Sequence, residues 1–288
     1  MSVPWMVACI IIDSAVILAN FVEQLLIVRK WKSLDRIDYL LLSLSISDFT
    51  SGVATLGIDG WYLSGEMNPT IVPRISHEIV TKIFDSVFLF SVFASTFHVI
   101  AVAVERFYAI KYPRKYYIFN TFKIKFGTIA GIWIISLILT PTFSVLSVFS
   151  LDTKIGVYIR ACVFAFSAFF VLIVYLYISL LLVLQRKSII QDFSPECNVQ
   201  QDRLKRMTMF CTFIGISFVV CLMPITVSYF DEDLYHPIGN LAITLNSLIN
   251  PCIYFAKVIY ESRSINRSRN ETTHALLESR SYIITTVD

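Results

Sequence analysis

Charged side chains inside long apolar stretches are the residues of this sequence best placed to do chemistry. Asp48 lies in one such stretch, and the adjacent pair Glu105 and Arg106 ends another, which covers residues 83–104. An ionisable group at or near membrane depth is costly unless it snorkels or has a partner. We therefore interpret these three residues as functional positions, although for Glu105 and Arg106 alone a stop-transfer flank is the simpler alternative.

Small polar side chains from other stretches are candidate partners of Asp48. A lone polar residue in a spanning helix more often joins helices together than performs a function, but a cluster around a carboxylate shifts that balance. We expect four residues to converge on this carboxylate: Ser95, Asn246, Ser247 and Asn250. The sequence shows no catalytic dyad, metal-ligand cluster or phosphate-binding loop, so we do not expect an enzyme.

Seven apolar stretches must position these residues. Of the 288 residues, 56% are hydrophobic and the mean hydropathy is +0.68, whereas soluble domains are usually about 45–50% apolar. The stretches cover residues 4–28, 39–63, 75–110, 122–148, 157–184, 203–230 and 234–256. Each is longer than the roughly 20 residues with which a helix crosses a bilayer. We predict an all-α membrane protein, a seven-transmembrane helix bundle.

The distribution of basic residues predicts the orientation of the bundle. Lys and Arg gather in segments 29–36, 111–125 and 186–206, which alternate with segments poorer in positive charge. By the positive-inside rule, the amino terminus is extracellular and the carboxyl terminus cytoplasmic. We therefore expect a multi-pass protein of the plasma membrane.

The motifs and their order resemble the rhodopsin-like (class A) G-protein-coupled receptors. Glu105-Arg106-Phe107, followed by Ala-Ile-x-x-Pro, is similar to the end of their third helix, and Asn246-Ser-x-x-Asn-Pro-x-x-Tyr254 to their seventh. Further landmarks follow the family's order along nearly the whole chain: Asn20, Asp48, Trp133, Tyr175 and Phe218-x-x-Cys-Leu-Met-Pro224.

This resemblance implies a receptor that binds an extracellular ligand and activates a heterotrimeric G protein through a groove opened by the sixth span. The implied microswitch and coupling residues are Glu105, Arg106, Tyr175, Phe218, Pro224, Asn250, Pro251 and Tyr254. The implied sodium and water pocket consists of Asp48, Ser95, Asn246, Ser247 and Asn250. A Na⁺ ion at Asp48 is therefore the only bound ion or cofactor that we consider.

Several departures from the family pattern narrow the resemblance. Thr81 replaces the usual third-helix cysteine and residues 149–157 contain none, so we expect no disulfide. Ser167 stands in place of the fifth-helix proline. Leu222 replaces the sixth-helix tryptophan, and Leu204 the acid that locks onto the arginine in many members. The missing disulfide, the absent proline and the short second outer loop resemble the melanocortin receptors and their adenosine and cannabinoid relatives.

The ligand pocket is predicted from acids near the outer ends of the spans. Asp59 lies eleven residues after Asp48, about three helical turns, so both carboxylates point toward nearly the same face. Asp85 lies where melanocortin receptors carry an acid that grips a basic ligand together with an acid of the second helix. We predict a cationic small molecule or peptide as ligand, bound by Asp59, Asp85, Phe88 and His236. Solvated acids, or Asp85 paired with Lys82, are the alternative.

The carboxyl-terminal region divides into two predicted parts. Residues 257–265 contain no Gly or Pro and mix apolar with charged side chains, which predicts a short interfacial eighth helix. The receptor domain would then cover residues 1–265. Residues 266–288 form a polar, Ser/Thr-rich tail that we expect to be disordered and, by the resemblance, to bind arrestin. Membrane lipid is a further expected partner, and nucleic acid is not.

Two other functions stay open at this point. A scavenger or decoy receptor would bind ligand without signalling, but the intact Glu105-Arg106 and Asn250-Pro251 motifs disfavour it. A transporter usually shows internal repeats and paired broken helices near mid-membrane. The prolines of the spans, Pro141, Pro224 and Pro251, show no such symmetry.

Overall fold

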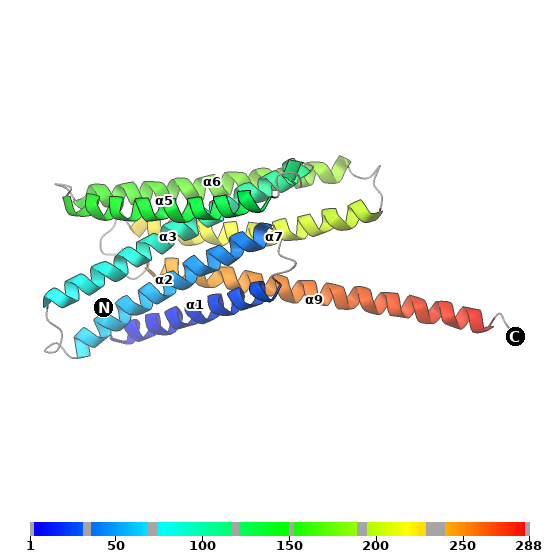
Figure 1. Cartoon of the computed structure of the whole chain (residues 1–288), viewed down its shortest axis with the longest axis horizontal. Helices are drawn as coiled ribbons and strands as arrows, with labels where there is room; N and C mark the ends of the chain where they lie inside the picture. Colours follow the sequence, from blue (N-terminus) through cyan, green and yellow to red (C-terminus); the bar gives the residue numbers. More distant parts are fainter. Residues whose placement is uncertain are drawn as a thin grey trace.

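Seven long α-helices make up the fold in a computed structural model that describes residues 3–30, 36–67, 74–113, 115–116, 121–149, 153–188, 195–228 and 240–285. No strand occurs in these residues. The helices are α1 (Val3–Arg29), α2 (Arg36–Met67), α3 (Arg74–Lys111), α5 (Phe122–Phe149), α6 (Thr153–Ser188), α7 (Pro195–Ser228) and α9 (Asn240–Thr285). Figure 1 shows them side by side as one elongated bundle, with α9 reaching far beyond the others.

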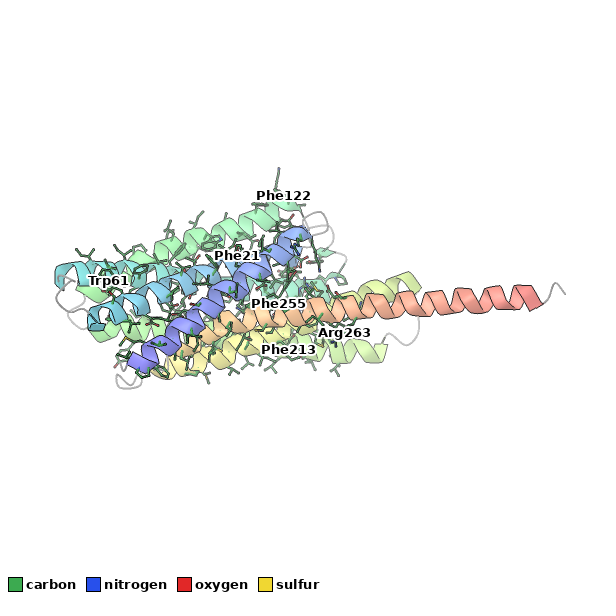
Figure 2. All side chains as sticks on the ribbon, turned by 90° about the horizontal axis from the view of Figure 1, so that it is seen from below. Phe21, Trp61, Phe122, Phe213, Phe255 and Arg263 are labelled. Atoms are coloured by element: carbon green, nitrogen blue, oxygen red, sulfur yellow. The ribbon has the colours of Figure 1, made fainter. Side chains whose placement is uncertain are left out.

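The surface of the bundle is the surface of a membrane protein. Each of the seven described helices contains a segment long and apolar enough to cross a bilayer. Phe21, Phe122 and Phe213 are exposed, and Figure 2 shows Phe122 projecting away from the ribbon. Exposed apolar side chains cost nothing against lipid tails, which are as apolar as they are. The predicted all-α seven-transmembrane bundle is thus confirmed.

Helix α3 is the central helix of the bundle. It packs against α2, α5, α6 and α7, whereas α1 packs against α2 and α9. The buried apolar side chains of α3 include Phe93 and Val99, both fully inaccessible, and Phe93 stacks on Phe164 of α6 at a centroid distance of 5.7 Å. This packing fixes the rotation of α3 and thereby aims Ser95 and Arg106 inward.

Helix α9 differs from the two-part region predicted from the sequence. The structure shows one continuous helix from Asn240 to Thr285, with no separate eighth helix. After Pro251 the chain contains neither Gly nor Pro, so no residue that breaks helices ends it. Its 46 residues span about 69 Å at 1.5 Å per residue, more than twice the roughly 30 Å of a bilayer core. The distal part must therefore project from the membrane.

Three prolines lie inside helices, as the sequence predicted: Pro141 in α5, Pro224 in α7 and Pro251 in α9. Each removes one backbone hydrogen bond, and neighbouring helices make that loss tolerable in a membrane. Pro251 directly follows Asn250, a polar residue described below.

We predict that Gly57→Ala destabilises the bundle, because α2 and α3 approach closely at this glycine. A Cβ at Gly57 would lie 2.4 Å from Cε1 of Phe84, so the ring or the helix must move, at a cost of about 1–3 kcal/mol. The matched control is Gly60→Ala on the same helix, where a Cβ meets no atom within 4 Å. Thermal unfolding of the purified protein measures both, and equal unfolding temperatures would contradict the prediction.

Candidate functional site

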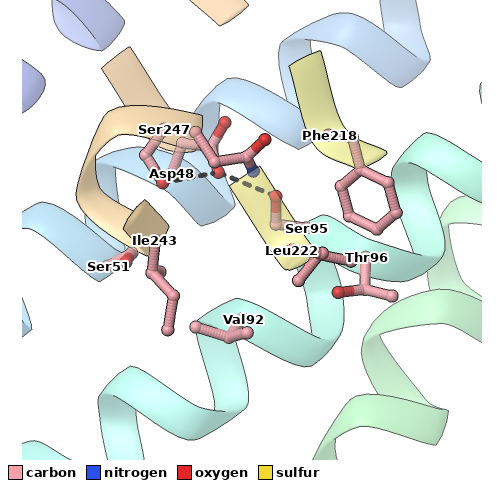
Figure 3. A pocket seen from close by; sticks show the side chains of 10 residues that line it. Asp48, Ser51, Val92, Ser95, Thr96, Phe218, Leu222, Ile243 and Ser247 are labelled. Atoms are coloured by element: carbon pink, nitrogen blue, oxygen red, sulfur yellow. Dashed lines mark hydrogen bonds between the residues drawn. The ribbon is translucent and has the colours of Figure 1, made fainter. Parts of the chain in front are cut away.

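The carboxylate of Asp48 joins three helices in the middle of the bundle. Asp48 is completely buried. Its Oδ1 accepts hydrogen bonds from Ser95 Oγ on α3 at 2.8 Å and from Ser247 Oγ on α9 at 3.2 Å, and its Oδ2 accepts one from Asn250 Nδ2 at 2.8 Å. Figure 3 shows Ser95 and Ser247 converging on this acid. The structure thus brings together three of the four predicted partners with Asp48.

A small cavity adjoins this carboxylate. It offers about 20 Å³ to the centre of a water-sized sphere, which is enough for one such occupant. Asn246, the fourth predicted partner, lines the cavity, as do Phe218 and Leu222 of α7. The Oδ1 atom of Asn246 is buried and has no hydrogen-bond partner among the described residues. The cavity therefore combines one carboxylate, hydroxyl groups and a free amide oxygen, the oxygen ligands that hard cations prefer.

Asn20 connects α1 to the same centre. Its Nδ2 donates to the carbonyl oxygen of Ser247 at 3.0 Å and to that of Val16 at 2.9 Å. Ser247 also bonds Asp48, so one residue of α9 links α1 to the carboxylate. Phe218 of α7 lines the cavity as well. Five of the seven described helices therefore meet at this centre: α1, α2, α3, α7 and α9.

Glu105 and Arg106 form a buried ion pair at the far end of α3. Arg106 donates from Nε to Glu105 Oε2 at 3.0 Å and from its terminal nitrogen to both carboxylate oxygens at 2.7 and 2.8 Å. Tyr116, which follows α3, donates its hydroxyl to Glu105 Oε1 and accepts from Arg106 at 3.4 Å. All three residues are buried. We define them as the Arg106 clamp.

Tyr116 is a residue that the sequence analysis missed. It lies in the basic segment 111–125, which was interpreted from its positive charges and not from its aromatic residues. Its burial next to the ion pair was not readable from spacing, because the chain bends after α3. The pairing of Arg106 with Glu105 was predicted, but a third member of the clamp was not.

Two tyrosines stand on either side of the clamp region. Tyr175 of α6 is buried, and its hydroxyl has no hydrogen-bond partner among the described residues. Its ring fills the space left by Gly215 of α7, where a Cβ would lie 2.2 Å from Cε2 of the ring. Tyr254 of α9 is buried as well, under the ammonium group of Lys257 at 5.3 Å from the ring centroid. The structure thus places both tyrosines that were predicted as microswitches inside the bundle.

Of the predicted ligand residues, Asp59 lies on α2, and Asp85 and Phe88 lie on α3. Asp59 is partly buried and lies within hydrogen-bonding range of Asp13 and Cys9 on α1. Asp85 is exposed, and Tyr62 interacts electrostatically with both Asp59 and Asp85.

Asp13 is the acid that the prediction left out. It is 1% exposed, and its Oδ2 has no hydrogen-bond partner among the described residues. Two acids therefore meet between α1 and α2, with a third acid beyond Tyr62. Phe88 on α3 is half-buried and packs against the apolar core. His236, the remaining predicted ligand residue, lies outside the described residues.

A second polar junction, which sequence reasoning also missed, joins α2, α3 and α5. His98 is completely buried; its Nδ1 lies 2.7 Å from the carbonyl oxygen of Ala94 and its Nε2 2.7 Å from Ser43 Oγ. A carbonyl only accepts, so Nδ1 carries the proton and Nε2 accepts from the serine hydroxyl. Trp133 Nε1 donates to the same hydroxyl oxygen at 3.0 Å. The hydroxyl of Ser43 on α2 is thus the hydrogen-bond partner of one ring on α3 and of one ring on α5.

Comparison with known families assigns the chain to its class. Residues 19–254 match the model of the 7 transmembrane receptor (rhodopsin family). The chain belongs to this family of G-protein-coupled receptors, whose members are receptors rather than enzymes. The match contains the Asp48 centre and the Arg106 clamp. No curated protein matches the chain.

We predict that Ser43→Ala destabilises the receptor, because it removes the shared partner of His98 and Trp133. Leaving buried polar groups unsatisfied costs about 1–3 kcal/mol. Ser14→Ala is the matched control, since Ser14 is exposed and bonds only the carbonyl of Ile10 within its own helix. Thermal unfolding of the two variants under identical conditions tests this. A drop for Ser14→Ala as large as for Ser43→Ala would contradict it.

Proposed function

We propose that the protein binds an extracellular ligand and activates a heterotrimeric G protein through the end of the bundle that carries the Arg106 clamp. The buried clamp is the observation that supports this most directly. Arg106 is held by a neighbouring carboxylate and a tyrosine. Tyr175 lies close enough to interact with it electrostatically but does not bond it, so Arg106 has a second partner available when the clamp breaks. The amino terminus is extracellular and α9 ends in the cytoplasm in this proposal.

Activation breaks the clamp and moves α7. Glu105 and Tyr116 engage Arg106 in the clamp, and Tyr175 does not bond it. When α7 moves outward at this end, Tyr175 loses the surface of Gly215 against which it packs, and its hydroxyl becomes available to Arg106. The groove so opened receives the carboxyl-terminal helix of a Gα subunit. Ligand and G protein favour the same conformation, so each tightens the binding of the other.

The clamp predicts opposite effects of two substitutions on ligand-free signalling. Tyr116→Phe removes the hydroxyl that bonds Glu105, weakens the inactive state by about 1 kcal/mol, and should raise basal G-protein activation several-fold. Arg106→Ala should abolish it, because the groove loses its cationic contact. Nucleotide exchange on a panel of Gα subunits, at matched surface expression, measures both.

Tyr112→Phe, at an exposed position in the same segment, serves as control and should behave as wild type. Basal exchange that is equal in wild type, Tyr116→Phe and Arg106→Ala would contradict signalling through the clamp. That outcome, combined with ligand binding, would instead favour a decoy receptor.

The ligand that we propose is cationic. The acids Asp13 and Asp59 lie side by side between α1 and α2, and Asp85 extends negative charge to α3 across Tyr62. Like charges that lie close together repel, and a positive group between them relieves that repulsion. An Arg or Lys side chain of a peptide, or a small cation, has the required chemistry. The resemblance to melanocortin receptors and their relatives stays a prediction.

For a cationic agonist, Asp59→Asn and Asp85→Asn should each lower potency at least about tenfold, equivalent to about 1.4 kcal/mol. Glu261→Gln removes one acid at the opposite end of the bundle, where Glu261 pairs with Lys30 at 3.7 Å, and should leave potency unchanged. Concentration–response curves from expression-matched cells measure the agonist potency of each variant. A neutral agonist, or unaltered potency for both Asp variants, would refute the acidic pocket.

The remaining partners follow from the same proposal. Na⁺ would occupy the cavity beside Asp48, whose carboxylate and hydroxyl groups match a hard cation. Arrestin would bind the Ser/Thr-rich segment 266–288, and lipid would contact the exposed apolar side chains of the helices.

A further inference from the structure

Glu23 is a buried carboxylate that none of the roles described above uses. It lies on α1, is 2% exposed, and its Oε2 has no hydrogen-bond partner among the described residues. The nearest cationic group, Lys257 Nζ, is within electrostatic range of Glu23 but pairs with Asp38 on α2 at 3.4 Å. An uncompensated carboxylate in the interior of a membrane protein is expensive, so this group must either hold a proton or gain a positive charge.

The position of Glu23 follows from the contact between α1 and α9. Asn20 bonds the backbone of Ser247, and the two helices run in the same direction (Figure 1). Glu23 follows Asn20 by three residues and Asn250 follows Ser247 by three, which places both one turn further along the same helix faces. Glu23 therefore lies at the level of Asn250, on the side of Asp48 that is nearer to the Arg106 clamp. Its electrostatic interaction with Asp48 agrees with this placement.

Two amide oxygens at these levels are also unsatisfied. The Oδ1 atoms of Asn20 and Asn250 are buried and have no hydrogen-bond partner among the described residues, although both amide nitrogens donate. Their residues are 0% and 3% exposed. Neutral amide oxygens and one carboxylate form an oxygen-only ligand set, which suits a small hard cation.

We propose that Glu23, together with the amide oxygens of Asn20 and Asn250, forms a second monovalent-cation position, one helical turn from the Asp48 cavity toward the Arg106 clamp. Na⁺ is the cation of matching chemistry. The inference deepens the sodium pocket proposed above and does not depend on G-protein coupling. It gives the carboxylates of Glu23 and Asp48 one positive charge each, since Lys257 is already bound by Asp38.

Sodium-dependent unfolding of the purified full-length receptor tests the proposal without ligand or G protein. Thermal unfolding is followed while NaCl replaces N-methyl-glucamine chloride at constant ionic strength. Wild type should show a saturable rise in unfolding temperature. Glu23→Gln should raise the half-saturating Na⁺ concentration by about fivefold or more, whereas Glu261→Gln, which removes an exposed acid, should not.

Two further variants separate the second position from the first. Asp48→Asn should retain a weaker saturable response to Na⁺, and the double variant Asp48→Asn/Glu23→Gln should lose it. Glu23→Asp keeps the charge but shortens the side chain by one methylene group, and it should also raise the half-saturating Na⁺ concentration. This variant tests the proposal if Glu23→Gln does not fold. An unchanged curve for the Glu23 variants, complete loss of response in Asp48→Asn alone, or no saturable response in wild type would overturn the proposal. Loss of signalling with an intact Na⁺ curve would instead contradict only the coupling function.

Discussion

Burial of the Asp48 carboxylate in an apolar bundle is the constraint on which the rest of the structure depends. Lipid tails and apolar side chains cannot solvate the charge, so the protein must supply donors. It does so from α3 and α9, through Ser95, Ser247 and Asn250. Meeting this need fixes the rotation of both helices relative to α2. The same rotation turns Arg106, three turns along α3, toward the interior, where Glu105 and Tyr116 hold it.

Those two polar centres are coupled by geometry rather than by a continuous chain of hydrogen bonds. Phe218 lines the Asp48 cavity and lies on α7, whose Gly215 receives the ring of Tyr175 near the clamp. A movement of α7 therefore changes the cavity and the clamp together. In the activation that we propose, α7 is the element whose two positions both ends of the bundle would bias, which is the physical requirement for allosteric coupling.

Hydrophobic composition and the length of the apolar stretches were sufficient to predict the seven helices. The polar residues within those stretches were sufficient to predict Ser95, Ser247 and Asn250 as partners of Asp48. What could not be predicted depends on the contacts between helices and on chain direction after a helix ends. Asp13 was visible as an acid in the first span, but its proximity to Asp59 follows from the packing of α1 on α2. Tyr116 lies beyond α3, where no period applies. Residues 257–265 were expected to be helical, but the helical course of residues 266–285 was not, because polar composition was taken as disorder although no residue there breaks a helix.

The central claim is that the Arg106 end of the bundle opens when a G protein binds. Electron–electron distance measurements between spin labels at Tyr112→Cys, just after α3, and Met209→Cys, on α7, test it most directly, since both native side chains are exposed. The background variant carries serine in place of its reactive native cysteines, including the exposed Cys162 and Cys252. Adding nucleotide-free heterotrimeric G protein should shift the distance distribution to values several ångströms longer in the clamp-intact receptor. A distribution that stays unchanged with every Gα class would contradict the account.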